Sequence, residues 1–138
     1  MEYGKSVDNT ENRNWFLIDS KLGSMNDYTK ACRTHWSVGA EYKRSVESLI
    51  GWSIKRAKVK GDLQATEKPV EVFIEWHERT RKRDCDNIQS AQKFILDALQ
   101  HFKIIKNDSR KYIKQIHHKV VDDKKDFVIV ELREVNEK

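Results

Sequence analysis

Residues 70–101 place a strand pattern directly before a helix pattern, and this order restricts the chain to folds that combine strands with helices. Apolar and polar residues alternate from Val70 to His77, as in a strand with one buried face. Apolar residues then recur on one face of a helix predicted from Asn87 to His101: Ile88, Ala91, Ile95, Ala98, Leu99 and Phe102. The sequence therefore predicts an α/β fold in which the strand delivers residues 79–86 to the start of a helix.

The rest of the chain fits one compact domain of the same class. We expect a strand at 15–18, a turn at 23–27, a loop at 28–37, a helix at 38–58, and strands at 112–121 and 127–135. The last two strands are expected to pair as a hairpin around residues 122–125. Residues 1–14 are expected to be a disordered tail, which leaves residues 15–138 as a single domain.

Composition and charge favour a cytoplasmic protein with a polyanionic partner. The net charge is +5, and acids are sparse in the basic segments 79–83 and 111–119. Signal-peptide and membrane-spanning patterns are absent from the sequence, so we expect no membrane partner. The two cysteines, Cys32 and Cys85, form neither a disulfide framework nor a metal-ligand pair.

Three acids suggest a metal-dependent reaction on a phosphodiester. Asp84 and Asp86 are two residues apart, so in an extended segment their side chains leave the backbone on the same side. A returning helix can bring Asp108 to the same place. Magnesium prefers a few hard oxygen ligands, and beside an arginine-rich segment such an ion suits phosphodiester hydrolysis. This arrangement indicates a nuclease.

Each of these residues also has an ordinary structural explanation. Asp86 and Asn87 can cap the helix that follows them, and Asp108 can form a turn. Lys93 and Asp97 are four residues apart on the helix, so they can form an exposed ion pair worth a few tenths of a kcal/mol. The spacing of the residues leaves both explanations open.

Several segments together resemble the RusA family of Holliday junction resolvases, found in bacteria and their phages. They are RKRDCDNI at 81–88, KFILDAL at 93–99 and IIKNDS at 104–109. In that family a D-x-D-N motif precedes a helix with a lysine and a D-A-L element, and an acidic pair follows a short loop. GSMNDY at 23–28 and Lys43 resemble the N-terminal glycine element and basic first helix of the family. The likeness extends from about residue 15 to residue 135.

The resemblance implies a RusA-like α+β domain with a small mixed sheet and two main helices, and it implies a site. Asp84, Asp86 and Asp108 would bind Mg²⁺, with Mn²⁺ as a substitute, and Lys93 would be the catalytic lysine. Asp97 and Asn107 would be auxiliary. This chain is about three residues longer than the family pattern between Asn87 and the lysine, so counting forward reaches Ser90 and counting back reaches Lys93. We choose Lys93, because serine cannot supply a positive charge.

The resemblance also implies the partners, which are branched DNA and a second copy of the chain. A homodimer would present two identical sites to a two-fold symmetric four-way junction. The candidate DNA-binding residues are Arg79, Arg81, Lys82, Arg83, Lys43, Lys30 and Arg33. Three alternatives remain: a non-catalytic DNA-binding module, a basic protein that binds an acidic partner, and a related nuclease that prefers flaps or forks.

Overall fold

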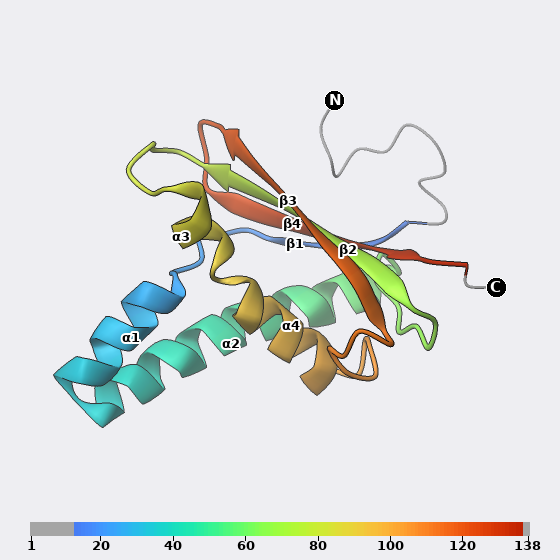
Figure 1. The fold of residues 1–138 in the computed structure, drawn as a ribbon, viewed down its shortest axis with the longest axis horizontal. Coiled ribbons are helices and arrows are strands. Elements are labelled where there is room, and N and C mark those ends of the chain that lie inside the picture. Colours follow the sequence, from blue (N-terminus) through green and yellow to red (C-terminus); the bar gives the residue numbers. More distant parts are fainter. Residues whose placement is uncertain (1–12, 137–138) are drawn as a thin grey trace.

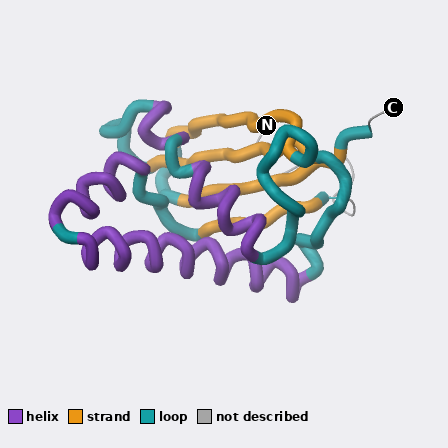
Figure 2. The backbone as a smooth tube through the Cα atoms, turned by 60° about the horizontal axis from the view of Figure 1, so that its bottom comes forward, coloured by secondary structure: helices purple, strands orange, loops and turns teal. Residues whose placement is uncertain are grey.

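The computed structural model describes residues 13–136, which form a four-stranded sheet with helices packed on one of its faces (Figures 1 and 2). The strands are β1 (Asn14–Ile18), β2 (Val70–Glu78), β3 (Ile113–Asp122) and β4 (Phe127–Glu134). The helices are α1 (Met25–Thr34), α2 (Trp36–Lys60), α3 (Cys85–Gln89) and α4 (Gln92–His101). The predicted α+β class with a mixed sheet is confirmed, whereas the homodimer stays a prediction.

The order of the strands in the sheet is β1-β4-β2-β3, so β2 lies between the last two strands of the chain. It pairs in parallel with β3 and antiparallel with β4. The prediction that β3 and β4 pair as a hairpin is therefore wrong, although both strands exist. A parallel pair requires a long crossover, which the chain makes through α3 and α4. Alternation in the sequence identifies a strand but does not identify its neighbour.

The hydrophobic core lies between this sheet and the helices. Alternate residues of β2 are buried on the helix-facing side, and they lie opposite the buried valines and leucine of β4. The core residues of these strands are Val70, Val72, Ile74, Trp76, Val128, Val130 and Leu132. From the helices, α2 contributes Val46, Ile50 and Ile54, and α4 contributes Phe94, Ile95 and Leu99. The strands predicted at 15–18 and 70–77 and the helix at 38–58 are confirmed within one or two residues at most ends.

The segment predicted as a turn and a loop is helical. Helix α1 starts at a capping box, because the Ser24 hydroxyl accepts from the Asp27 amide at 3.1 Å while the Asp27 carboxylate accepts from the Ser24 amide at 3.0 Å. The helix has no fully buried residue. Met25 and Tyr28 are only partly buried against the core, so α1 covers the edge of the core and does not fill it.

The helix predicted from Asn87 to His101 is two helices. Between them, the Ser90 hydroxyl donates to the Asn87 carbonyl at 2.6 Å and accepts from the amide of Met25 at 3.1 Å. Ser90 thereby joins the break between α3 and α4 to the first residue of α1. The apolar residues of α3 and α4 both face the core, so the helical pattern in the sequence continues across the break and does not reveal it.

Residues 13 and 14, which were expected from the sequence to belong to the tail, contact the sheet. Asn14 belongs to β1, and the side chain of Arg13 lies 3.8 Å from the carboxylate of Glu131. Pairing with β4 orders this segment despite its polar composition. Residues 1–12 of the predicted tail lie outside the described residues.

Replacing Ile74 tests the central position of β2. Ile74 is completely buried opposite Val130, so Ile74→Ala should lower the free energy of unfolding by about 2–5 kcal/mol. Urea denaturation measures this loss. The matched control is Val59→Ala on the exposed side of α2, which should change the free energy by no more than about 0.5 kcal/mol. Equal stability of the two variants would contradict the assignment of β2 to the core.

Candidate active site

The acidic motif follows the carboxyl end of β2 and begins α3. Asp84 occupies the position that precedes the helix, but its side chain makes no capping hydrogen bond. Asp86 lies in the first turn of α3, and both carboxylates are exposed. Within residues 13–136, neither carboxylate takes part in a hydrogen bond or ion pair. Helix capping by the Asp84 side chain therefore does not account for its position.

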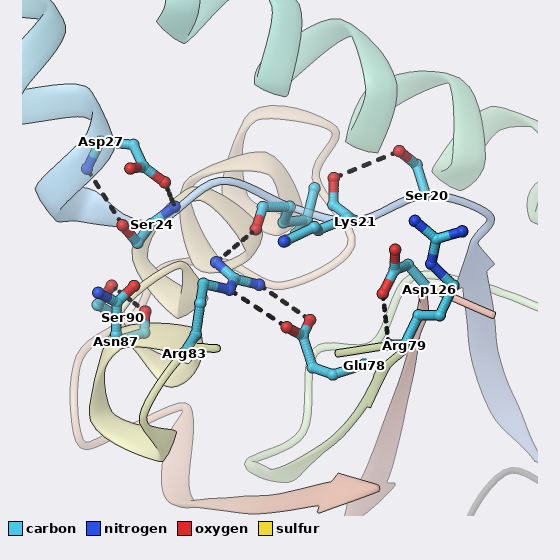
Figure 3. A network of polar contacts seen from close by, with 11 residues as sticks. Ser20, Lys21, Ser24, Asp27, Glu78, Arg79, Arg83, Asn87, Ser90 and Asp126 are labelled. Atoms are coloured by element: carbon cyan, nitrogen blue, oxygen red, sulfur yellow. Dashed lines mark hydrogen bonds and ion pairs between the residues drawn. The ribbon is translucent and has the colours of Figure 1, made fainter. Parts of the chain in front are cut away.

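Arg83 fixes the backbone immediately before Asp84 (Figure 3). Its guanidinium donates to both carboxylate oxygens of Glu78, at 2.9 and 3.2 Å, and to the carbonyl of Leu22 at 3.1 Å. The side chains of Arg83 and Glu78 are only 12% and 5% exposed. This contact ties the start of the acidic motif to the end of β2 and to the connection between β1 and α1.

The other three cations of the basic run lie at the surface. Arg79 is positioned through its backbone, since its amide donates to Asp126 at 2.7 Å. The guanidinium of Arg81 lies 3.2 Å from Asp122 and its side chain is 85% exposed. Lys82 is also exposed. Arg79, Arg81 and Lys82 can therefore meet an approaching polyanion, whereas Arg83 is occupied within the fold.

Two carboxyl groups, Asp27 of α1 and Asp123 of the loop between β3 and β4, accept hydrogen bonds that lower their pKa. The backbone amide of Ser24 donates to Asp27 and lowers the pKa of that carboxyl group. The backbone amide of Lys124 and the ring of His77 lower the pKa of Asp123. The ring of His77 also contacts the buried Glu75 of the same strand, and its contact with Asp123 joins β2 to the loop that precedes β4.

Asn87 has a feature that the sequence did not reveal. Its side-chain oxygen is buried and accepts no hydrogen bond from the described residues. A buried oxygen without a donor costs free energy, and a water or a bound ion can satisfy it. The oxygen belongs to the residue directly after Asp86, so an unsatisfied acceptor lies next in the chain to the two carboxylates.

Lys93 lies in the first turn of α4, beyond the break in the helix. Its amine lies 3.3 Å from the carboxylate of Asp97, and its side chain is 57% exposed. This is the exposed pair that the spacing of the two residues allowed. Ser90 is the other candidate for the lysine position, and its hydroxyl already forms hydrogen bonds with the backbone of Asn87 and of Met25.

Asp108 is not brought together with Asp84 and Asp86 within one chain. Residues 103–112 return to the start of β2, where the amide of Val70 donates to Tyr112 at 2.8 Å. The acidic motif instead follows the end of β2, a strand of nine residues that spans about 30 Å (Figure 1). Among the described residues, no three His, Cys, Asp or Glu side chains form a group that could hold a metal ion.

The reason lies in the path of α4. This helix leads away from the acidic motif for ten residues, or about 15 Å, and β3 then starts beside the start of β2. Asn107 meanwhile has a turn role, because its side-chain oxygen accepts from the amide of Ser109 at 2.9 Å. The expectation that a returning helix carries Asp108 back to the other acids is therefore not met in the single chain.

The remaining candidate DNA contacts lie on the first two helices. Lys30 and Arg33 are exposed on α1, and Lys43 is exposed on α2. Helix α1 extends away from α3, and α2 runs back from the end of α1 (Figure 1). Lys30 and Arg33 lie toward the end of α1, whereas Lys43 follows Tyr42, whose hydroxyl contacts the carbonyl of Ser24 at the start of α1. Within residues 13–136, no helix is long and apolar enough to cross a lipid bilayer.

The match to a known family agrees with the motif at the end of β2. The family model described as endodeoxyribonuclease RusA matches residues 8–133, nearly the whole chain. No curated protein gives a significant match. Nucleases of this kind usually need a divalent metal ion. The matched region contains the entire acidic motif, Lys93 and Asp108, and the chain belongs to the RusA family of Holliday junction resolvases and is an endodeoxyribonuclease.

Proposed function

We propose that this protein is a magnesium-dependent nuclease that resolves four-way DNA junctions by paired phosphodiester hydrolysis, with manganese as a substitute metal. It would act in recombination, repair or the processing of phage DNA. The observation that carries the proposal is the exposed and unpaired carboxylate pair Asp84 and Asp86, held beside solvent-facing cations by the buried contact of Arg83 with Glu78.

The residues at this position fit a magnesium ion that is shared with the substrate. Magnesium is commonly bound by one or two carboxylates together with phosphate oxygens and water. Asp84 and Asp86 supply two free carboxylates, and the unsatisfied side-chain oxygen of Asn87 lies next in the chain. A bound ion would act as a Lewis acid toward the scissile phosphate and would lower the pKa of an attacking water.

We propose that Asp108 reaches this site from the second subunit of a homodimer. Asp108 lies near the start of β2, and the acidic motif follows the end of the same strand. A two-fold axis that sets two chains antiparallel brings the start of one beside the end of the other, and it does so twice. The dimer would then have two complete sites, as two symmetric cuts require.

The cations have separate roles in this proposal. Lys93 would stabilise the negative charge that develops on the phosphate, since its amine has only an exposed and weak ion pair to give up. Arg79, Arg81 and Lys82 would contact neighbouring phosphates and so set the register of the DNA without reading its sequence.

One experiment separates this function from the alternatives. Purified protein is incubated with a labelled four-way junction, a flap and a linear duplex, each with Mg²⁺ or with EDTA. Symmetric paired cuts in the junction alone, dependent on Mg²⁺, are the expected result. Binding without cleavage would indicate a DNA-binding module. Faster cleavage of the flap than of the junction would indicate a nuclease that prefers flaps or forks. The absence of both binding and cleavage would indicate a protein that binds an acidic partner.

The first functional prediction concerns the acids. Asp84→Asn, Asp86→Asn and Asp108→Asn should each abolish cleavage yet leave junction binding intact, because each change removes a metal ligand and reduces the repulsion of DNA. Cleavage assays with Mg²⁺ and binding assays in EDTA measure the two effects. Glu67→Gln, an exposed acid in the connection before β2, is the matched control and should cut normally.

Mixing two inactive variants tests whether the site is shared between subunits. After subunit exchange, a dimer of Asp84→Asn and Asp108→Asn chains would have one site with no substitution and one site with both. An equimolar mixture should therefore recover roughly a quarter of the wild-type sites, seen as nicking of one strand. If each site is built within one chain, the mixture stays inactive.

The second functional prediction concerns the lysine. Lys93→Ala should lower the cleavage rate by about 10²-fold or more, in the range found for the loss of a group that stabilises transition-state charge. Its exposed pair with Asp97 predicts almost no loss of stability. Ser90→Ala should retain cleavage and lose some stability, because it removes two hydrogen bonds. The reverse pattern would identify position 90 as the functional one.

The third functional prediction concerns the contacts of the basic run with DNA phosphates. Each phosphate contact contributes about 0.9 to the slope of log affinity against log salt, so changing Arg81 and Lys82 together to alanine should flatten the slope by up to about 2. Lys58→Ala with Lys60→Ala, at the far end of α2, is the matched control. We leave Arg83 unchanged, because its loss strands the buried Glu78 charge at a cost of about 3–5 kcal/mol. An unchanged slope would mean that the run faces away from DNA.

A further inference from the structure

We propose that the tip of the α1–α2 hairpin recognises the branch point of DNA by stacking Trp36 on an exposed base pair. The hairpin tip comprises residues 30–36, which join the end of α1 to the start of α2 and project away from the sheet (Figure 1). This inference rests on the proposed function, since it concerns how the enzyme distinguishes branched DNA from a linear duplex.

Trp36 is the most conspicuous residue of the hairpin tip. Its side chain is 76% exposed at the first position of α2, so it contributes little to the core. Its ring lies 5.6 Å from the ring of His35, with an angle of 33° between the two planes. His35 is exposed as well. Two neighbouring aromatic rings at a projecting tip form a surface on which a planar base pair can stack.

The hairpin holds this surface in place before any ligand binds. His35 alone separates the two helices: its amide donates to Ala31 at 3.3 Å, and its ring nitrogen accepts from the amide of Ser37 at 3.1 Å. Next to the tip, α2 packs directly on α1 at Gly39. A Cβ atom there would lie 2.5 Å from the sulfur of Cys32 and 3.0 Å from its Cα. Such a tightly closed connection presents Trp36 at a low entropic cost on binding.

The charge of the hairpin tip suits DNA. Residues 28–40 contain two cations, Lys30 and Arg33, and no acid, and both cations are exposed. Proteins that stack bases on aromatic side chains combine them with cations that follow the phosphate backbone. A partner with phosphates on either side of an apolar stacking surface therefore fits the tip.

The position of the tip is consistent with a contact near the cut. The start of α1 is joined to α3 by the hydrogen bond from Met25 to Ser90, and α1 has ten residues, or about 15 Å. At about 3.4 Å per base pair, this length corresponds to a few nucleotides. An internal base pair of a duplex has both faces covered, whereas a base pair at an opened branch point has one face free. The contact would therefore select structure and not sequence.

Two tryptophans on the same helix provide a matched experiment. Trp52 is 70% exposed in the middle of α2, so Trp52→Ala is a control of equal chemistry outside the tip. Affinity for a four-way junction and for a linear duplex is measured in Ca²⁺ without cleavage. Trp36→Ala should weaken junction binding roughly 5- to 150-fold, which corresponds to the 1–3 kcal/mol typical of one stacked base. The affinity of Trp36→Ala for the linear duplex should equal that of the wild type. Trp52→Ala should bind both DNAs like the wild type, and Trp36→Phe should retain most of the affinity for the junction.

A fluorescent base at the branch point gives a second readout. 2-Aminopurine at that position should change its fluorescence when wild-type protein binds, and this change should be lost with Trp36→Ala. Equal junction affinity for Trp36→Ala and wild type would overturn the inference, and so would an equal loss on the linear duplex. A changed oligomeric state of Trp36→Ala would assign the tip to a protein contact and would also overturn it.

The outcome for the wild type separates this inference from the function on which it rests. A wild-type protein that neither binds nor cuts junctions would overturn the proposed function and the stacking contact together. A wild type that resolves junctions, with a Trp36→Ala protein that does so equally well, would overturn only the stacking contact. Unfolding temperatures of both tryptophan variants should match that of the wild type, because both side chains are exposed.

Discussion

Strand β2 is the element on which the other parts of the structure depend. It is hydrogen-bonded along both edges, in parallel to β3 and antiparallel to β4, and one of its faces is buried under the helices. The last residue of the strand, Glu78, holds Arg83 and thereby the start of the acidic motif. The same strand thus forms the centre of the core and determines where the candidate active site begins.

The contact between Glu78 and Arg83 shows how burial can make one arginine of the basic run differ from its neighbours. Two charges withdrawn from water are stable only when their hydrogen-bonding capacity is well satisfied. Arg83 achieves this with two bonds to Glu78 and one to the carbonyl of Leu22. Arg81, two residues earlier, remains at the surface, where it forms an exposed ion pair with Asp122. The fold therefore gives neighbouring arginines of one basic run different environments.

The separation of Asp108 from Asp84 and Asp86 within one chain is the reason that we propose a dimeric site. A parallel pair of strands places the start of β3 beside the start of β2, so Asp108 and the acidic motif lie near opposite ends of the sheet. A single chain built in this way does not bring together the three carboxylates that we propose as metal ligands. A symmetric dimer would assemble two such sites at once, and a four-way junction requires two symmetric cuts. The exposed hairpin tip would add a contact that depends on the shape of DNA.

The sequence by itself determined the α+β class, the strands β1 and β2, the long helix α2 and the position of the acidic motif. These are local properties, because alternation, helical periodicity and a short motif are complete within about 10 to 20 residues. Helix α1 was missed although the sequence contained its start signal, the capping-box spacing of Ser24 and Asp27. The break between α3 and α4 was missed because Ser90 bonds to Met25, which is distant in the sequence.

Only the tertiary structure decided the partner of each strand, the burial of Arg83 and the separation of Asp108 from Asp84. All three depend on contacts between segments far apart in the chain: β2 inserts between β3 and β4, Glu78 and Leu22 enclose Arg83, and α4 leads away from the motif. A side chain that the fold buries with a partner, as it does Arg83, is not available to a ligand. A pattern of residue types cannot show this, because the competing partners lie on other segments of the chain.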